Sequence, residues 1–378
     1  MSDIQNLLSR MDLDGECSRL CAEMEQVGAG DVASELDRPA GRYSLTRLMR
    51  LISPAGQQYL EQMAQQARSL TIQRFGRTIQ LYAPLYLSNV CVNSCVYCGY
   101  NRTTQFQRTR LSVEQAVVEA EVIANEGFRD ILLVSGEDPE FITVDYLAQL
   151  AERLGGRFAS VSVEIYPMSE EEYRRLFAAG IDGVTLYQET YNRRLYAQCH
   201  PAGPKSDYNM RIESADRFAR AGMRRIGLGV LLGLGDWRSE ALALGEHACY
   251  LMRRYWRSAV SFSFPRLCPA RDVAAKWEHS VSDSELVQMM LALRLCFADA
   301  GIVLSTRESP ALRDHLIDLC VTRSSAGSRT NPGGYTGHDH TGRQFEVADR
   351  RSPAEVAEVI RRCGREAVWK DWDRTFTG

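Results

Sequence analysis

Short apolar runs that alternate with helical patterns constrain the fold of this 378-residue chain more than any other feature. The expected strands cover residues 79–87, 131–134, 160–166, 183–188, 225–232, 260–264, 302–305 and 319–324. Strands that alternate with helices form parallel sheets through right-handed crossovers. The alternation therefore predicts a closed (β/α)8 barrel of the TIM type, whereas fewer units with extra elements would leave the barrel partly open.

Helical patterns fill the intervals between these strands. Ser112 begins one of them, and Gln115, three residues later, matches a capping box. Gly127 follows this pattern, at a position where glycine commonly ends a helix. The remaining helices are expected at 143–154, 169–179, 190–199, 209–221, 238–256, 283–299 and 309–318.

Two further segments flank the expected barrel. Residues 1–40 mix short apolar groups with acidic residues and glycine, and they are expected to form a loosely packed helical lead-in. Firmer apolar spacing predicts helices at 44–52 and 59–75, and a last helix is expected at 353–362. The chain therefore divides into an N-terminal helical extension (1–75), the barrel (76–325) and a C-terminal tail packed on the barrel (326–378).

Composition excludes several classes of protein. The net charge of −3 gives no reason to expect nucleic acid or an anionic membrane as a partner. The chain has no apolar run long enough to span a bilayer, and its N-terminus is polar and acidic, so we expect a cytoplasmic protein. Eleven cysteines are many for such a chain, but a disulfide framework is not expected in a reducing compartment.

Three cysteines follow the first strand at C-x3-C-x2-C spacing: Cys91, Cys95 and Cys98. Three thiolates can bind three irons of a [4Fe–4S] cluster and leave the fourth iron without a protein ligand. Tyr97 would place an aromatic ring beside that open iron. Structural zinc usually takes four ligands, and no fourth Cys or His follows at a suitable spacing. The pattern therefore favours a cluster over zinc, a disulfide or buried thiols.

This cysteine motif resembles that of the radical S-adenosylmethionine (SAM) superfamily. In that superfamily the open iron chelates the amino and carboxylate groups of SAM, and electron transfer cleaves SAM to methionine and a 5′-deoxyadenosyl radical. The cofactors carry the chemistry, and the protein binds and orients them. The resemblance thus implies a [4Fe–4S] cluster, SAM and an external reductant.

Polar residues end the second and third strands, at the carboxyl-terminal end of the barrel where active sites lie. Ser135, Gly136 and Glu137 are similar to the glycine-glycine-glutamate element that contacts the SAM amino group, with Ser135 in place of the first glycine. Glu164 is ionisable within an apolar strand and needs a partner or a purpose. The resemblance implies a hydrogen bond from Glu164 to the SAM ribose. The alternatives are a plain turn and a salt-bridged carboxylate at the rim.

The next two strands add further candidates. The polar run 187–191 at a strand end suits a pocket wall better than a core. Arg211 can bind the SAM carboxylate through two hydrogen bonds, or it can lie on the surface of its helix. Gly229 belongs to a glycine-rich strand, which indicates close approach of a flat group. The resemblance implies that this strand gives backbone contacts to adenine.

Ser305 and Arg307 end the seventh strand, and their i,i+2 spacing points both side chains to the same side. If that side is the barrel lumen, a hydroxyl and a guanidinium face the cluster and suit the carboxylate of an amino-acid substrate. The alternative is a surface ion pair between Arg307 and Glu308.

Several sequence blocks, in one order, resemble the 2-iminoacetate synthase family, the tyrosine lyases of thiamine thiazole biosynthesis. These blocks are 74–76, 85–89, 187–191, 261–267, 304–310, 325–328, 332–335 and 368–373. A related tyrosine lyase that matures hydrogenase carries a second cluster motif in a C-terminal domain. Here the tail has only Cys363, so no second cluster is expected.

This resemblance implies cleavage of the Cα–Cβ bond of L-tyrosine to 2-iminoacetate and p-cresol, with 5′-deoxyadenosine and methionine as co-products. It also implies two partners, a thiazole synthase protein complex and a reductase or flavodoxin-type electron donor. Two alternatives stay open: a related radical SAM aromatic amino acid lyase of another pathway, such as a tryptophan lyase, and a cluster-bearing electron carrier without catalysis.

Overall fold

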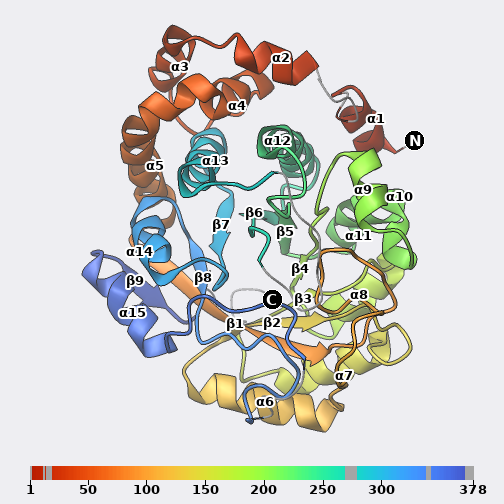
Figure 1. Cartoon of the computed structure of the whole chain (residues 1–378). Helices are drawn as coiled ribbons and strands as arrows, with labels where there is room; N and C mark the ends of the chain where they lie inside the picture. The colour runs from red at the N-terminus through yellow and green to blue at the C-terminus, as the bar shows by residue number, and fades with distance from the viewer. Residues whose placement is uncertain (1, 12, 14–18, 269–278, 338–341, 371–378) are drawn as a thin grey trace.

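Eight parallel strands form a closed barrel in the computed structural model, which describes residues 2–11, 13, 19–268, 279–337 and 342–370 (Figure 1). The strands are β1 (Thr78–Ser88), β2 (Asp130–Ser135), β3 (Ser160–Glu164), β4 (Gly183–Thr185), β5 (Arg225–Gly229), β6 (Ala259–Ser263), β7 (Gly301–Leu304) and β8 (Arg323–Ser325). Neighbours in the chain pair with each other, and β8 and β2 both pair with β1, which closes the sheet. The predicted TIM-type barrel is confirmed.

The long strand β1 carries three neighbours along its length. Its carboxyl-terminal half pairs with β2, and residues 80–82 pair with β8. Its first residues pair with β9 (Glu366–Val368), a strand near the end of the described chain that the sequence pattern did not predict. The C-terminal tail is thereby hydrogen-bonded to the barrel at the amino-terminal end of β1.

Helices surround the strands, as Figure 1 shows. The crossover and flanking helices are α5 (Leu60–Phe75), α6 (Val113–Asn125), α7 (Val144–Leu154), α8 (Glu170–Ala178), α9 (Arg193–Cys199), α10 (Tyr208–Ile212), α11 (Ser214–Arg220), α12 (Trp237–Arg254), α13 (Asp283–Cys296), α14 (Pro310–Leu319) and α15 (Pro353–Arg362). The capping box predicted at Ser112 and Gln115 is present at the start of α6. The helix expected at 209–221 is instead two helices, α10 and α11.

Two other expectations are corrected. The last barrel strand begins only at Arg323, because α14 continues to Leu319 and Cys320 forms its C-cap. The N-terminal lead-in is not loose where the structure describes it. Its helices α1 (Asp3–Ser9), α2 (Arg19–Glu25) and α3 (Ala29–Leu36), followed by α4 (Leu45–Ile52), bury apolar side chains such as Ile4 and Val32 completely.

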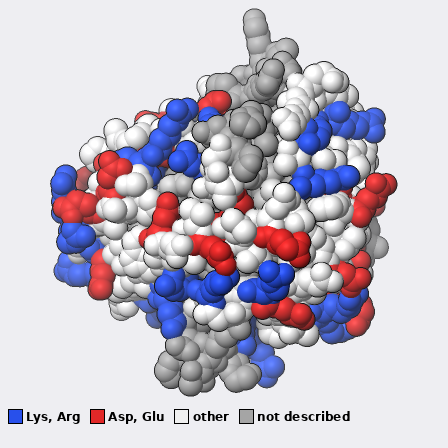
Figure 2. Space-filling view, turned by 90° about the horizontal axis from the view of Figure 1, so that it is seen from below, with Lys and Arg blue, Asp and Glu red and all other residues white. Residues whose placement is uncertain are grey.

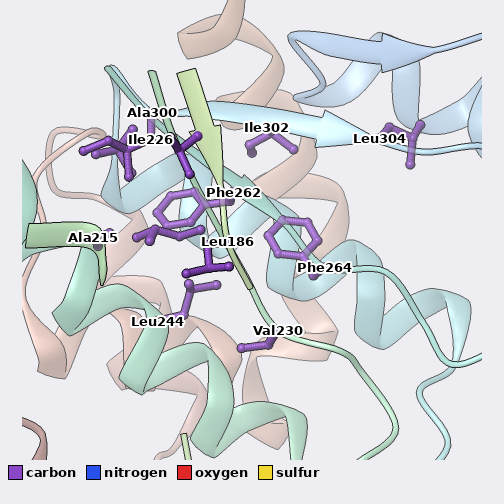
Figure 3. Packing of buried hydrophobic residues seen from close by; sticks show 14 of the residues in the cluster. Leu186, Ala215, Ile226, Val230, Leu244, Phe262, Phe264, Ala300, Ile302 and Leu304 are labelled. Carbon is purple, nitrogen blue, oxygen red and sulfur yellow. The ribbon is translucent and has the colours of Figure 1, made fainter. Parts of the chain in front are cut away.

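The main hydrophobic core lies between the strands and the surrounding helices. Figure 3 shows Ile226 of β5 and Phe262 of β6 close to Ala215 of α11 and Leu244 of α12, and all four belong to one buried cluster. Among the residues that the structure describes, no helix combines the length and apolar character needed to cross a bilayer. On the face seen in Figure 2, basic and acidic side chains intermix, in keeping with the small net charge.

The amino-terminal end of the barrel lumen is hollow rather than filled by large branched side chains. A cavity of about 380 Å³ lies there, lined partly by small residues such as Ser162, Gly227 and Ser261. Charged side chains in this region pair with one another. The buried Asp130 accepts hydrogen bonds from Arg225 (2.7 Å), Arg323 (2.5 Å) and Gln80 (2.6 Å).

Candidate active site

The cysteine loop follows β1 and lies over the carboxyl ends of the strands. Cys91, Cys95 and Cys98 all line one cavity of about 110 Å³. The loop approaches β2 so closely that a Cβ added to Gly136 would lie 2.2 Å from the carbonyl oxygen of Val90. Only glycine permits this approach, so Gly136 sets the position of the first cysteine relative to the barrel.

The three thiols fit a cluster better than a single metal ion. Among the described residues, no three His, Cys, Asp or Glu side chains lie close enough to share one ion. The thiolates of a cubane cluster lie farther apart than those around a single ion, because each thiolate binds its own iron. Burial raises the pKa of Cys95 to about 12 and also raises that of Cys98. Since thiolates are the ligands, cluster assembly must remove these protons.

The turn after β2 contributes a carboxylate to the same cavity. Ser135, Gly136 and Glu137 all line it, as expected for a turn that contacts SAM. Asn93, within the cysteine loop, donates a hydrogen bond to Glu137 Oε2 (2.6 Å), and the Ser135 hydroxyl donates to the carbonyl of Gly136. The side chain of Glu137 is thus oriented by the loop that carries the cysteines.

Glu164, the last residue of β3, also lines this cavity. Burial, followed by the nearby Glu189, raises the pKa of Glu164 to about 7. No described residue forms a salt bridge with Glu164, so the salt-bridged alternative is wrong within the described chain. Near neutral pH this carboxyl group can either donate or accept a hydrogen bond.

A compact charge cluster forms the opposite wall. Glu189 binds Lys205 (2.7 Å) and Arg211 (3.4 Å), and Arg211 also donates to the carbonyl of Tyr187 (2.6 Å). Burial alone would raise the pKa of Glu189, but Lys205 and Arg211 outweigh burial and hold that pKa below its usual range. Arg211 is buried and lines the cavity, so the alternative of a surface arginine is wrong.

Glu189 has a left-handed backbone conformation, with a φ of 70°. Such a conformation is uncommon outside glycine and concentrates at functional sites. The polar run 187–191 was predicted to form a pocket wall, and Tyr187 and Glu189 do line the cavity. No local sequence pattern predicts this backbone conformation.

Tyr97 lies between two of the cysteines but is not among the residues that line their cavity. Its hydroxyl lies 2.9 Å from Nε2 of His200, whose Nδ1 lies 2.8 Å from the carbonyl oxygen of Tyr196. Because a carbonyl only accepts, Nδ1 carries the proton and Nε2 accepts from Tyr97. Burial lowers the pKa of His200 to about 3, so this arrangement persists at neutral pH. The structure therefore gives Tyr97 a contact that orients the loop.

Ser305 and Arg307 line a second, adjoining cavity of about 60 Å³. The guanidinium of Arg307 lies 3.5 Å from the ring centre of Phe345 in the C-terminal tail. Glu308 instead pairs with Arg266, so the alternative of an Arg307–Glu308 surface pair is wrong. Four residues line both cavities and mark where they meet: Val134, Glu164, Tyr187 and Gln344.

Gly229, expected beside adenine, is approached by a protein side chain. A Cβ added there would lie 2.4 Å from the ring of Tyr187 and 2.5 Å from the carbonyl oxygen of Ser263. The flat group that needs a glycine at this point of β5 is therefore the Tyr187 ring, which lines both cavities.

The site also contains residues that sequence patterns did not single out. Asn93 was visible between two cysteines, but its bond to Glu137 spans 44 positions. Gln344 lies in the tail, and its carboxamide oxygen accepts a hydrogen bond from Tyr86 of β1 (2.8 Å) across 258 positions. No local pattern predicts contacts across such separations.

Comparison with known proteins agrees with this geometry. The family model for the Radical SAM superfamily matches residues 85–244, and that for the Biotin and Thiamin Synthesis associated domain matches residues 263–366. The 2-iminoacetate synthases of Salmonella typhimurium and Escherichia coli are each 42% identical to this chain over 347 residues, which cover 91% of this chain and 92% of each relative.

A solved structure extends the likeness to three dimensions. The FeFe-hydrogenase maturase HydG from Carboxydothermus hydrogenoformans superposes with a TM-score of 0.88 at 33% identity, covering 98% of this chain and 86% of that one. The similarity therefore includes the barrel, the cysteine loop and the tail. The chain belongs to the radical SAM superfamily and, within it, to the 2-iminoacetate synthase family.

Proposed function

We propose that this protein is a 2-iminoacetate synthase that cleaves the Cα–Cβ bond of L-tyrosine to 2-iminoacetate and p-cresol. The observation that carries the proposal is the junction of two cavities, one lined by Cys91, Cys95 and Cys98 and the other by Ser305 and Arg307. Substrate carboxylate and cysteine-bound cluster would then lie on opposite sides of the reacting atoms. Family membership, at 42% identity, supports the same activity.

The cysteine cavity has the groups that the two cofactors require. When bound, the [4Fe–4S] cluster and SAM supply, with an electron from an external reductant, the radical that takes a hydrogen atom from the substrate. Cys91, Cys95 and Cys98 would hold the cluster. Glu137 and the turn around it would bind the SAM amino group, and Arg211 would bind its carboxylate.

Two further contacts would fix the nucleoside of SAM. Glu164 would hydrogen-bond the ribose hydroxyls, as donor or acceptor, because its pKa lies near 7. The strand that contains Gly229 would contact adenine through its backbone, with the Tyr187 ring packed against the glycine. Tyr97 would act on the cluster through the position of its loop.

On the substrate side, the guanidinium of Arg307 would bind the tyrosine carboxylate through two hydrogen bonds, and the Ser305 hydroxyl would add another. These contacts hold the amino group and Cα toward the cysteine cavity, which replaces a bimolecular encounter by a fixed geometry. The aromatic rings of Tyr86, Tyr187 and Phe345 line the substrate cavity and help to exclude water.

The proposal extends to the protein partners and the location of the enzyme. The product imine is labile in water, so direct delivery to a thiazole synthase partner is expected. A reductase or flavodoxin-type protein would supply electrons, and the chain would act in the cytoplasm without nucleic acid. The three parts 1–75, 76–325 and 326–378 would serve as extension, catalytic barrel and tail.

Anaerobic incubation of reconstituted protein with reductant, SAM and L-tyrosine tests the proposal. We expect p-cresol and 5′-deoxyadenosine, together with glyoxylate from hydrolysis of the imine. A parallel reaction contains L-tryptophan. Indole products without p-cresol would support another aromatic amino acid lyase, and an intact cluster that releases no 5′-deoxyadenosine would support a non-catalytic electron carrier.

A further inference from the structure

The tail segment 343–349 is attached to the loop that carries Arg307. The backbone amides of Ala348 and Asp349 both donate to the carbonyl oxygen of Thr306, each at 3.1 Å. Asp349 is fully buried and pairs with the equally buried Arg313. A buried, paired carboxylate of this kind fixes the segment against the barrel, because separating it from Arg313 would leave that buried guanidinium without a compensating charge.

Within this segment, Phe345 covers one face of the Arg307 guanidinium at 3.5 Å from the ring centre. Stacking leaves the N–H edge of a guanidinium available, since its donors lie in the plane of the group. No described carboxylate forms an ion pair with Arg307. Phe345 therefore holds Arg307 in one plane while the edge that binds carboxylates stays unused by the described protein.

The neighbouring Gln344 lies where the two cavities meet. Its backbone amide donates to Thr330 (3.1 Å), and its carbonyl oxygen lies so near Gly99 that a Cβ there would approach to 2.5 Å. Tyr86 donates to the side-chain oxygen Oε1 (2.8 Å). The Nε2 group, which carries two donors, has no acceptor among the described residues.

We propose that Gln344 and Phe345 of the tail belong to the substrate site: the Gln344 amide nitrogen donates a hydrogen bond to the bound amino acid at the cavity junction, and Phe345 is a positioning residue that orients Arg307 toward the substrate carboxylate. This inference rests on the proposed tyrosine lyase activity. It makes the tail a determinant of substrate binding rather than only a packing element.

The test measures L-tyrosine binding without turnover. Reconstituted protein with SAM but without reductant is dialysed to equilibrium against labelled L-tyrosine, and iron content and SAM binding are measured on the same samples. We expect Gln344→Ala and Phe345→Ala to weaken tyrosine binding about tenfold, the size of one lost hydrogen bond or orienting contact, with iron and SAM binding unchanged. Glu346→Ala, an exposed neighbour in the same segment, is the control and should match the wild type.

Conservative variants separate a binding role from a packing role. Gln344→Glu keeps the oxygen that accepts from Tyr86 but lacks the amide donor, so it should bind tyrosine as weakly as the alanine variant. Phe345→Tyr keeps the stacking ring and should restore wild-type affinity. If Gln344→Glu binds like the wild type, or if both alanine variants behave like Glu346→Ala, the inference is wrong. If the wild-type protein itself binds no tyrosine, the proposed function is wrong, and this inference fails with it.

Discussion

The two ends of the barrel lumen are both hollow and both charged, but they use their charges differently. At the amino-terminal end, Asp130 is shared by Arg225, Arg323 and Gln80, so its oxygens bind protein donors. At the carboxyl-terminal end, the described residues leave Glu164 and Arg307 without salt-bridge partners. The amino-terminal cavity is the larger, at about 380 Å³ against 110 and 60 Å³.

Cavity size therefore does not identify the site, whereas charged side chains without salt-bridge partners, Glu164 and Arg307 among the described residues, do. Charged groups that satisfy each other stabilise the fold and have little left for a ligand. Groups that neighbours hold in place, but whose donors or acceptors have no protein partner, can bind a ligand. The comparison predicts that substitutions at the amino-terminal end change stability and that substitutions at the carboxyl-terminal end change binding.

Cys95→Ala should give the largest effect. Loss of one of three ligands prevents assembly of the cluster, so absorbance of the iron–sulfur centre and all p-cresol formation should disappear. Cys363→Ala in the tail is the matched control and should retain both. Iron and sulfide analysis with the product assay measures this, and a Cys95→Ala protein with full iron content would contradict the ligand assignment.

Asp130→Asn tests the opposite end of the lumen. It removes the charge that Arg225 and Arg323 share and leaves Arg225 with its longer contact to Asp182 (3.4 Å). Breaking such a buried pair costs about 3 kcal/mol or more of unfolding free energy. Urea denaturation measures this cost. At a temperature where the variant stays folded, kcat and the KM for tyrosine should equal those of the wild type. A selective loss of tyrosine binding would contradict the assignment of this end of the lumen to stability.

Arg307→Ala should weaken tyrosine binding by about 10- to 100-fold, since hydrogen bonds to a charged group contribute about 1.5–3 kcal/mol. Cluster assembly and SAM cleavage without substrate should persist. Equal loss of tyrosine binding and of iron content would show that Arg307 serves the fold instead. Arg307→Lys keeps the charge but not the planar pair of donors, and we expect it to rescue only in part.

Glu164→Gln should give the smallest effect, visible as a pH dependence of stability. Because the pKa of Glu164 is raised from 4.5 to about 7, the folded state binds more protons than the unfolded state between these values. The unfolding free energy of the wild type therefore falls as pH rises through this window, and that of the variant does not. The variant should gain roughly 1–3 kcal/mol relative to the wild type between pH 4.5 and 7.5. A difference that is constant with pH, measured by urea denaturation of the apoprotein, would contradict the assignment.

The sequence predicted the barrel because strand and helix signals are local. Apolar runs, caps such as Ser112 and the cysteine spacing are each encoded within a few residues. The same reasoning predicted that Ser135, Glu137 and Arg307 lie at the carboxyl-terminal rim, since strand ends meet there.

Other parts of the site could not be predicted in this way. The hydrogen bond between Tyr86 and Gln344 and the stacking of Phe345 on Arg307 exist only once the tail folds back over the barrel. The tail strand β9 is three residues long and depends on β1 for its pairing. The left-handed conformation of Glu189 is imposed by its surroundings and not by its residue type.

The central claim is that three thiolates leave one iron open to SAM. The most direct test is electron paramagnetic resonance of the anaerobically reconstituted, reduced protein before and after addition of SAM. The account predicts a [4Fe–4S] signal whose g-values shift when SAM binds the unique iron. A signal that SAM leaves unchanged, from a centre with four protein ligands, would contradict the account.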